Sequence, residues 1–385
     1  MTVSRRPPES PVVIAPTVSP APLDPLGDLP LDPLVAALPK AELHLHQEWF
    51  ARLDRVLAHR EGRPPYDWRA WAQRLMAETP PGMPRLAKLS RTWPVAQELD
   101  GIPENFVARV EDLLEDAAAD GAIFVEARFG KDALRPDFMP LFREAERRVQ
   151  VRHPRLRAEA VICLLFMDEP ERLEAQIVAS LAAACDGLAG IDLLYAPYDV
   201  EADWAPMYRV IQRAADAGLG ITAHAGEFAT ANIAAALRIP GLTRLGHAVA
   251  AAQDPRLLDA LAESGATVEC SLTCNVVLGA VPSYKEHPIR RFIEAGIPVV
   301  LCTDDPIQVC TTIGREYAVA HALGFSPHEL LAITRNALRA AFTTPTRRTE
   351  LLAELDAWVV AHPLQDDSQA RLQVDMPDVR EDHAP

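Results

Sequence analysis

Cysteine is scarce in this sequence, and its placement excludes a disulfide scaffold. Six cysteines stand among 385 residues, and no Cys-x-x-Cys pair occurs. Most of them lie in apolar runs, where a free thiol behaves as a small hydrophobic side chain. We therefore expect a reduced, cytoplasmic protein. Cys270 and Cys274 could be offered as metal ligands, with packing or pocket lining as the alternative.

Basic charge and long apolar runs are also in short supply. The 54 acidic residues outnumber the 38 basic ones, giving a net charge of −16, and no basic stripe could follow a nucleic-acid backbone. No apolar run is long enough to span a membrane. The start of the chain carries Arg5 and Arg6, but prolines interrupt its apolar patch, which makes a poor signal peptide. These absences favour a small-molecule partner, and no feature sets an oligomeric state.

The two ends differ in composition from the middle. Residues 1–32 are rich in proline and poor in periodic apolar residues, which predicts a flexible leader. Residues 362–385 are acidic and polar, which predicts a flexible tail. Residues 33–361 remain as one large domain, somewhat longer than the ~250 residues typical of a (β/α)8 barrel.

Short apolar stretches alternate with amphipathic segments through this domain, a pattern typical of parallel strands with crossover helices. Eight strands favour a closed (β/α)8 (TIM-type) barrel, with a doubly wound open sheet as the runner-up, although no Gly-rich phosphate loop follows the first strand. The expected strands are Glu42–His46, 122–129, 158–165, 190–195, 219–224, 243–247, 266–271 and 297–303. Residues 51–100 read as a helical insertion after the first strand. Its Trp68, Trp71 and Trp93 either cover the mouth of the site or pack in the core.

The first strand carries two histidines at alternate positions. In Ala41-Glu-Leu-His-Leu-His46 a period of two places Glu42, His44 and His46 on one side. Two imidazoles so placed at a strand end can chelate one ion. Two histidines satisfied by ordinary hydrogen bonds are the alternative.

Further polar residues close other apolar runs. His224 and Glu227 end the run from Gly220, His247 ends the next strand, and Asp304 and Asp305 follow the last. His44, His46, His224 and Asp304 form a set suited to one Zn²⁺ per chain with room for a water, which predicts a hydrolytic site.

The residues beside this set suggest catalytic roles. We expect Glu227, kept protonated by burial, to donate a proton to a ring nitrogen. His247 is a candidate to orient the hydroxide or stabilise developing charge, and Asp305 to hold or deprotonate the water. Alternatively, Asp304 and Asp305 only cap the helix that starts at Pro306. Glu126 and Arg128 share a strand face, which predicts a structural ion pair inside the barrel.

Taken together, the motifs resemble the adenosine deaminase family of metal-dependent hydrolases. The resemblance implies that Glu227 protonates purine N1, and that His247 and Asp305 position and activate a zinc hydroxide that attacks C6 and expels ammonia. The matching segments run from about 38 to 360: Leu38-Pro-Lys-Ala-Glu-Leu-His-Leu-His46, Leu113-Leu-Glu-Asp-Ala-Ala-Ala-Asp-Gly121, His224-Ala-Gly-Glu227, Leu245-Gly-His247, Asn275-Val-Val-Leu-Gly-Ala-Val-Pro282, His287-Pro288, Thr303-Asp-Asp-Pro306 and Thr334-Arg-Asn-Ala337.

The substrate pocket departs from the family pattern. The family has Leu-Asp-Gly or Ile-Glu-Gly after its His-x-His pair, whereas this chain has Gln47-Glu48-Trp49. Tyr195 stands where a family glycine contacts purine N3, and Pro197 replaces an acid. We expect Glu48, Trp49 and Tyr195 to contact the substrate. An adenosine-like nucleoside is the leading expectation, a free or modified aminopurine base such as adenine or an aminofutalosine-like compound is the alternative, and a non-catalytic relative is the third reading.

Overall fold

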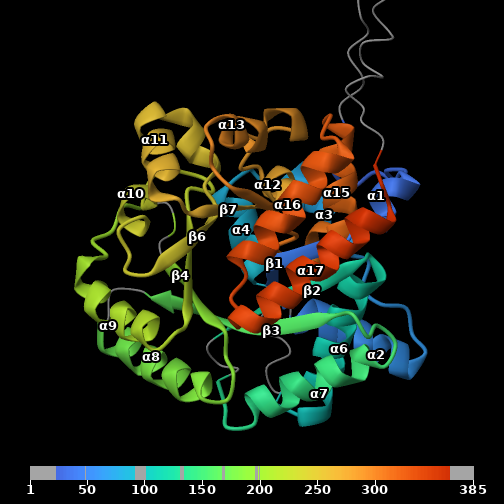
Figure 1. Ribbon diagram of the computed structural model, residues 1–385, viewed down its shortest axis with the longest axis horizontal. Coiled ribbons are helices and arrows are strands. Elements are labelled where there is room, and N and C mark those ends of the chain that lie inside the picture. Colours follow the sequence, from blue (N-terminus) through green and yellow to red (C-terminus); the bar gives the residue numbers. More distant parts are fainter. Residues whose placement is uncertain are drawn as a thin grey trace, which may run out of the picture.

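Eight parallel strands form one sheet, in which each strand pairs with the next along the chain (Figure 1). The computed structural model describes residues 23–47, 49–91, 101–130, 134–166, 170–195, 198 and 200–364. The strands are β1 Lys40–His46, β2 Ala122–Gly130, β3 Arg157–Phe166, β4 Gly190–Tyr195, β5 Gly220–Ala225, β6 Leu242–His247, β7 Thr267–Cys270 and β8 Val299–Leu301.

The sheet closes between the last strand and the first. Just beyond β8, Asp304 pairs with Leu45 of β1 in a parallel bridge. The Asp304 N–H donates to the His44 carbonyl at 2.8 Å, and the His46 N–H donates to the Asp304 carbonyl at 2.8 Å. The predicted (β/α)8 barrel is therefore confirmed, and the open doubly wound sheet is wrong.

Helices cover the outside of the barrel, and their buried faces follow the apolar spacing of the sequence. On α6 the periodic residues Phe106, Val110, Leu113 and Leu114 are all buried. The helices are α1 Pro33–Ala37, α2 Trp49–Glu61, α3 Trp68–Glu78, α4 Met83–Ser90, α6 Pro103–Ala119, α7 Phe138–Gln150, α8 Pro170–Ala184, α9 Ala205–Asp216, α10 Ile233–Ala236, η3 Val249–Gln253, α11 Pro255–Ser264, α12 Leu272–Leu278, η4 Tyr284–Glu286, α13 Ile289–Glu294, α14 Pro306–Val309, α15 Ile313–Ala322, α16 Pro327–Ala340 and α17 Pro345–Ala361.

The helical insertion after β1 comprises α2, α3 and α4 and lies against α12 and α14, next to the carboxyl ends of the strands. The Gly82 N–H donates to the Leu278 carbonyl at 2.7 Å, and the Arg85 guanidinium donates to the Val277 carbonyl at 2.7 Å. Trp68 is buried, whereas Trp93 lies outside the described residues. The insertion therefore supports the segments that follow β7 and β8.

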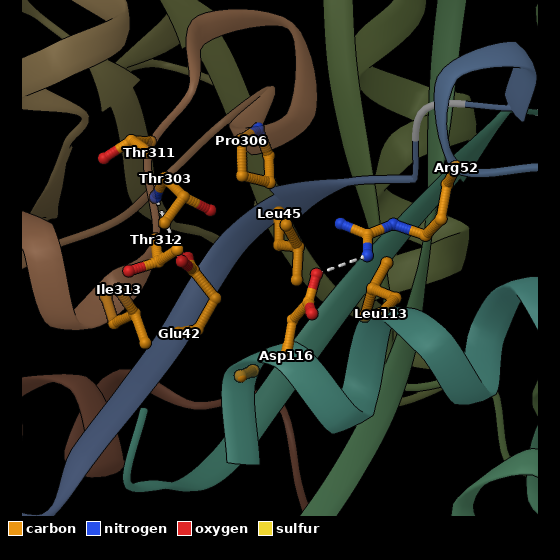
Figure 2. Close-up of a pocket in the computed structure, with 11 residues that line it drawn as sticks. Glu42, Leu45, Arg52, Leu113, Asp116, Thr303, Pro306, Thr311, Thr312 and Ile313 are labelled. Atoms are coloured by element: carbon orange, nitrogen blue, oxygen red, sulfur yellow. Dashed lines mark hydrogen bonds and ion pairs between the residues drawn. The ribbon is translucent and has the colours of Figure 1, made fainter. Parts of the chain in front are cut away.

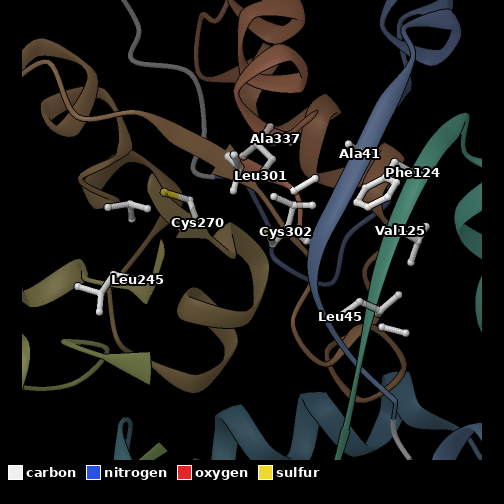
Figure 3. Packing of buried hydrophobic residues seen from close by; sticks show 14 of the residues in the cluster. Ala41, Leu45, Phe124, Val125, Leu245, Cys270, Leu301, Cys302 and Ala337 are labelled. Atoms are coloured by element: carbon white, nitrogen blue, oxygen red, sulfur yellow. The ribbon is translucent and has the colours of Figure 1, made fainter. Parts of the chain in front are cut away.

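Buried apolar side chains of the strands and of the surrounding helices form the main core. Figure 3 shows part of it, where Ala41 and Leu45 of β1 lie beside Phe124 and Val125 of β2, all of them buried. Burial of this apolar surface is the main driving force for closing the barrel.

Phe342 closes the end of the barrel opposite the strand carboxyl ends. Its ring lies so close to Gly190 and Gly220 that a Cβ atom at either would come within 2.5 Å of it. On its other side the Arg244 guanidinium stacks 3.6 Å from the ring centroid. The two glycines are needed for space at this end of the barrel.

The described ends of the chain pack on the barrel. Leu26, in the stretch assigned to the leader, is buried with Ala72 and Leu75 of the insertion, and Arg315 donates to the Pro25 carbonyl at 2.9 Å. Residues 1–22 and 365–385 lie outside the described residues. No helix in the described part of the chain is long and apolar enough to cross a membrane.

Candidate metal and catalytic site

Three histidines and one aspartate bring their ring and carboxylate atoms together at the carboxyl ends of β1, β5 and β8. His46 Nε2 lies 3.2 Å from His44 Nε2 and 3.3 Å from His224 Nε2. Asp304 Oδ1 lies 3.4 Å from His44 Nε2 and 3.5 Å from His46 Nε2. The structure thus brings together all four residues that the sequence assigned to a metal.

These separations fit a tetrahedral ion. In a zinc site the nitrogen and oxygen donors lie about 2.0–2.2 Å from the metal, so two neighbouring donors are about 3.4 Å apart. His247 is farther out, with its Nε2 3.9 Å from Asp304 Oδ2, although its donor atom also lies within 4.8 Å of those of His44, His224 and Asp304. The donor set could therefore hold a metal ion, with His247 beside it.

The backbone at these strand ends takes an unusual conformation. His247 and Asp304 have φ values of 64° and 66°, in the left-handed region that residues with a Cβ seldom adopt. Gly246 supplies space, because a Cβ there would lie 3.1 Å from His44 Cε1. Gly226 has a φ of 77°, and a Cβ there would meet Ile233 at 2.7 Å. The chain is bent at these points to direct side chains into the site.

Two buried carboxylates below the site hold two of the histidines. His44 Nδ1 lies 2.8 Å from Glu269 Oε2, and His224 Nδ1 lies 3.0 Å from Asp192 Oδ1. Burial disfavours the charge on Asp192, but Arg128 and His224 outweigh it and hold the pKa of Asp192 well below its usual range. An ionised carboxylate only accepts, so each histidine donates its Nδ1 proton and turns Nε2 toward the donor cluster.

One guanidinium joins these two carboxylates. Arg128 donates to Asp192 Oδ2 at 2.6 Å and to Glu269 Oε2 at 2.5 Å. The predicted pairing of Arg128 with Glu126 is wrong, because Glu126 pairs with Arg244 at 2.6 Å instead. The two residues share a strand face and do lie inside the barrel, but facing strands supply their partners. The sequence of a single strand does not show which residues of other strands lie within reach of its side chains.

Burial and the neighbouring charges shift the pKa values of His44 and His46 in opposite directions. Burial and Arg128 oppose protonation of His44, but hydrogen bonds to Asp304 and Glu269 prevail and raise its pKa to about 9. Burial lowers the pKa of His46 to about 3 despite the charge of Asp304. A cation at this position would therefore compete with a proton for His44 Nε2.

Glu227 and His247 face the donor cluster from the ends of β5 and β6. Burial, and then the charge of Asp304, raise the pKa of Glu227 well above its usual range, which favours the protonated carboxyl. Asn275 of α12 donates from Nδ2 to Glu227 Oε1 at 3.3 Å and lies 3.2 Å from His247 Nδ1. Glu227 is thus placed as a proton donor would be, and its raised pKa favours that role.

Asp305 occupies the N-cap position of α14, but its side chain makes no capping hydrogen bond. It is buried beside Asp304. The alternative prediction, that Asp304 and Asp305 serve only to cap the helix, is therefore not supported by the Asp305 side chain.

Three further residues reach the site, and only Cys274 among them was predicted from the sequence, as a possible metal ligand or pocket-lining residue. Cys274 is buried and its sulfur lies within 4.8 Å of donor atoms of Glu227 and Asp304, whereas Cys270 packs in the core. The ring of Tyr198 lies 6.5 Å from that of His224. Asn275 begins one of the segments that match the family, but the sequence did not predict its contacts with Glu227 and His247.

Glu42 does not join the histidines, so that part of the predicted alternation is wrong. A register shift between Glu42 and Leu45 breaks the period of two. The Glu42 carboxylate accepts from the N–H groups of His44 at 2.9 Å and Thr303 at 3.0 Å. Figure 2 shows it lining a small pocket outside the barrel with Leu45 and Asp116. Burial raises the pKa of Glu42 to about 8.

The predicted substrate contacts cannot be placed. Glu48 lies outside the described residues, and the side chains of Trp49 and Tyr195 lie outside the described atoms. Their assignment as substrate-binding residues stays a prediction.

A closed (β/α)8 barrel whose strand ends gather histidines and a carboxylate is the architecture of a metal-dependent barrel enzyme. The model of the adenosine deaminase family matches residues 39–358. The chain belongs to the adenosine deaminase family.

Relatives with different names match part of the chain. It is 43% identical over 156 residues to an adenine deaminase of Rhizobium leguminosarum bv. trifolii, covering 40% of this chain and 48% of that protein. It is 44% identical over 140 residues to an adenosine deaminase of Shewanella loihica, covering 36% and 42%. The chain thus spans about half the length of the curated relatives it matches. The crystal structure of the N6-mAMP deaminase of Arabidopsis is similar over 84% of this chain and 99% of that one, with 25% identity and a TM-score of 0.68.

Proposed function

We propose that this protein is a metal-dependent hydrolase that removes the 6-amino group of an aminopurine as ammonia. The observation that carries the proposal is the donor cluster of His44, His46, His224 and Asp304, whose separations of 3.2–3.5 Å match the edges of a tetrahedral zinc site. Family membership supports the same reaction.

We assign one Zn²⁺ to His44, His46, His224 and Asp304. When bound, it supplies the Lewis acidity that makes water a nucleophile at neutral pH. The Nδ1 hydrogen bonds of His44 and His224 to buried carboxylates keep their Nε2 atoms pointed at the ion. Other divalent ions compete for such a set, and metal analysis distinguishes them.

Glu227 and His247 lie side by side at the mouth of the site, with Glu227 Oε2 3.9 Å from His247 Nε2. Protonated Glu227 donates to a ring nitrogen, which makes the adjacent carbon more electrophilic. His247 orients the attacking water or stabilises the charge that develops during the attack, and Asp305 holds that water or takes its proton. All three side chains are buried, which keeps bulk water from competing with them.

The leading substrate class is a 6-aminopurine nucleoside, and a free aminopurine base is the second candidate. The match to an adenine deaminase favours the free base, and in the sequence Trp49 and Tyr195 stand where the family pattern has glycines. The two classes differ in whether the enzyme needs the sugar for turnover.

The test is ammonia release by the purified protein from adenine, adenosine, 2′-deoxyadenosine, aminodeoxyfutalosine and methylthioadenosine, with metal content measured on the same sample. Glu227→Gln should lower kcat by about 10²–10⁴-fold while the bound metal stays unchanged. Glu286→Gln, at an exposed position, is the matched control. Absence of ammonia from every 6-aminopurine would refute the proposal.

A further inference from the structure

His287 and Asn275 form a hydrogen-bonded chain behind the site that ends on His247 and Glu227. We propose that this chain fixes the proton of His247 on Nε2, so that its N–H points into the site as a donor, and that it leaves Glu227 Oε2 to carry the acid proton. His287 and Asn275 would be positioning residues, and the inference rests on the proposed function for its role in turnover.

The argument starts from a backbone amide, which can only donate. The Ile289 N–H donates to His287 Nδ1 at 3.2 Å, so that nitrogen must hold a lone pair. His287 is 5% exposed, and burial lowers its pKa to about 3. The ring is therefore neutral at pH 7, and its single proton is on Nε2.

The position of that proton orients the Asn275 amide. His287 Nε2 lies 3.2 Å from Asn275 Oδ1, and since Nε2 donates, the oxygen must face it. The amide NH₂ group then faces the opposite way. Both of its hydrogens have acceptors, Glu227 Oε1 at 3.3 Å and His247 Nδ1 at 3.2 Å.

His247 must therefore accept at Nδ1 and carry its proton on Nε2. That atom lies 3.9 Å from both Glu227 Oε2 and Asp304 Oδ2, inside the site. In this form His247 donates to an oxygen that gains negative charge and cannot act as a base. Because Glu227 Oε1 already accepts from Asn275, the acid proton belongs on Oε2.

The opposite amide orientation conflicts with its surroundings. A flipped Asn275 would set its NH₂ group against the His287 N–H, with two donors facing each other. All four side chains are buried, so water cannot repair these contacts.

The direct test is nuclear magnetic resonance of the full chain labelled with ¹⁵N-histidine, with and without added Zn²⁺. We expect the long-range proton–nitrogen pattern of His247 to show a protonated Nε2, and that of His287 likewise. A protonated Nδ1 on His247 would overturn the inference, whatever the enzyme's activity. Folding of variants does not enter this measurement.

Variants then test the chain itself. Asn275→Asp replaces the donor with an acceptor, so the His247 proton should move to Nδ1 and kcat should fall by about 10²-fold with KM changed little. Asn336→Asp is the matched control, because Asn336 donates to the Val299 carbonyl away from the site. If His247 keeps its proton on Nε2 in Asn275→Asp, the chain does not set it.

His287 offers a second pair of variants that leave Asn275 intact. His287→Gln retains a donor toward Asn275 Oδ1 and should keep kcat within about 3-fold, whereas His287→Phe removes it and should lose about 10-fold or more. Equal losses in both would overturn the role of the donor. Failure of the wild type to release ammonia, with the predicted proton positions still observed, would refute the proposed function and leave the tautomer assignment standing.

Discussion

His44 and His224 on the floor of the site differ from His247 on its wall in what their Nδ1 atoms touch. The floor histidines meet the carboxylates Glu269 and Asp192, whereas His247 meets the amide of Asn275. A carboxylate accepts a hydrogen bond from the Nδ1 N–H group, which leaves Nε2 with its lone pair for a metal. An amide donor does the reverse and leaves Nε2 with a proton for the substrate. A histidine side chain is thus prepared either to bind a metal or to donate a hydrogen bond, depending on the group that contacts its Nδ1 atom.

The largest expected effect comes from removing the cation that both floor carboxylates share. Arg128→Met leaves Asp192 and Glu269 buried without their joint partner, which should lower the free energy of unfolding by about 3–5 kcal/mol. Urea unfolding of the metal-free protein measures this. Arg213→Met, which removes an exposed pair with Glu174, should change it by less than about 1 kcal/mol. Equal effects of the two variants would show that the floor does not depend on Arg128.

Replacing the floor carboxylate of Asp192 by an amide should turn His224 Nε2 from a lone pair that binds metal into an N–H group. In Asp192→Asn the new amide can donate to His224 Nδ1 and move the ring proton to Nε2, so Zn²⁺ affinity should fall by about 10–100-fold. Competition with a chelator measures it. Asp216→Asn, on the outer surface of α9, should leave the affinity unchanged. An unaltered affinity in Asp192→Asn would contradict the comparison.

Lowering the pH should remove the stabilisation that comes from the floor carboxylate Glu269, and it should not change the contribution of Asn275 beside His247. Although burial opposes ionisation, Arg128 and Arg244 hold the pKa of Glu269 well below its usual range. Below the unfolded-state pKa of about 4 the unfolded chain binds protons that the folded carboxylate does not, so stability falls as pH falls. Unfolding free energies measured from about pH 7 down to pH 3 should converge for wild type and Glu269→Gln. The curve of Asn275→Ala should stay parallel to wild type, since an amide does not titrate.

The smallest expected effect concerns Tyr198, whose ring lies near that of the floor residue His224. Its ring lies 6.5 Å from that of His224 and 5.9 Å from that of Phe228, and its hydroxyl lowers the pKa of Glu227 against the larger effect of burial. Tyr198→Phe should reduce kcat/KM by about 5-fold, equivalent to about 1 kcal/mol for one hydrogen bond. Tyr208→Phe, whose hydroxyl donates to the Ala235 carbonyl, is the control. A loss above 100-fold would make Tyr198 part of the reaction itself.

Much of the barrel could be predicted because its signals are local. Short apolar runs and helical periodicity lie along consecutive residues, so all eight strands were located within a few residues of their observed bounds. The donor residues were predictable because parallel strands place their carboxyl ends at one edge. Glu42 was not, because a register shift turned its side chain away.

The amino-acid sequence alone determined that His44, His46, His224 and Asp304 meet at the mouth of the barrel, since strand period and strand order follow from neighbouring residues. Tertiary structure decided which nitrogen of each histidine carries its proton. That choice depends on contacts such as His44 with Glu269 and His287 with Asn275, which join residues of different strands and loops. Hydrogen-bond direction is set by the partner in space, and only barrel closure brings those partners together.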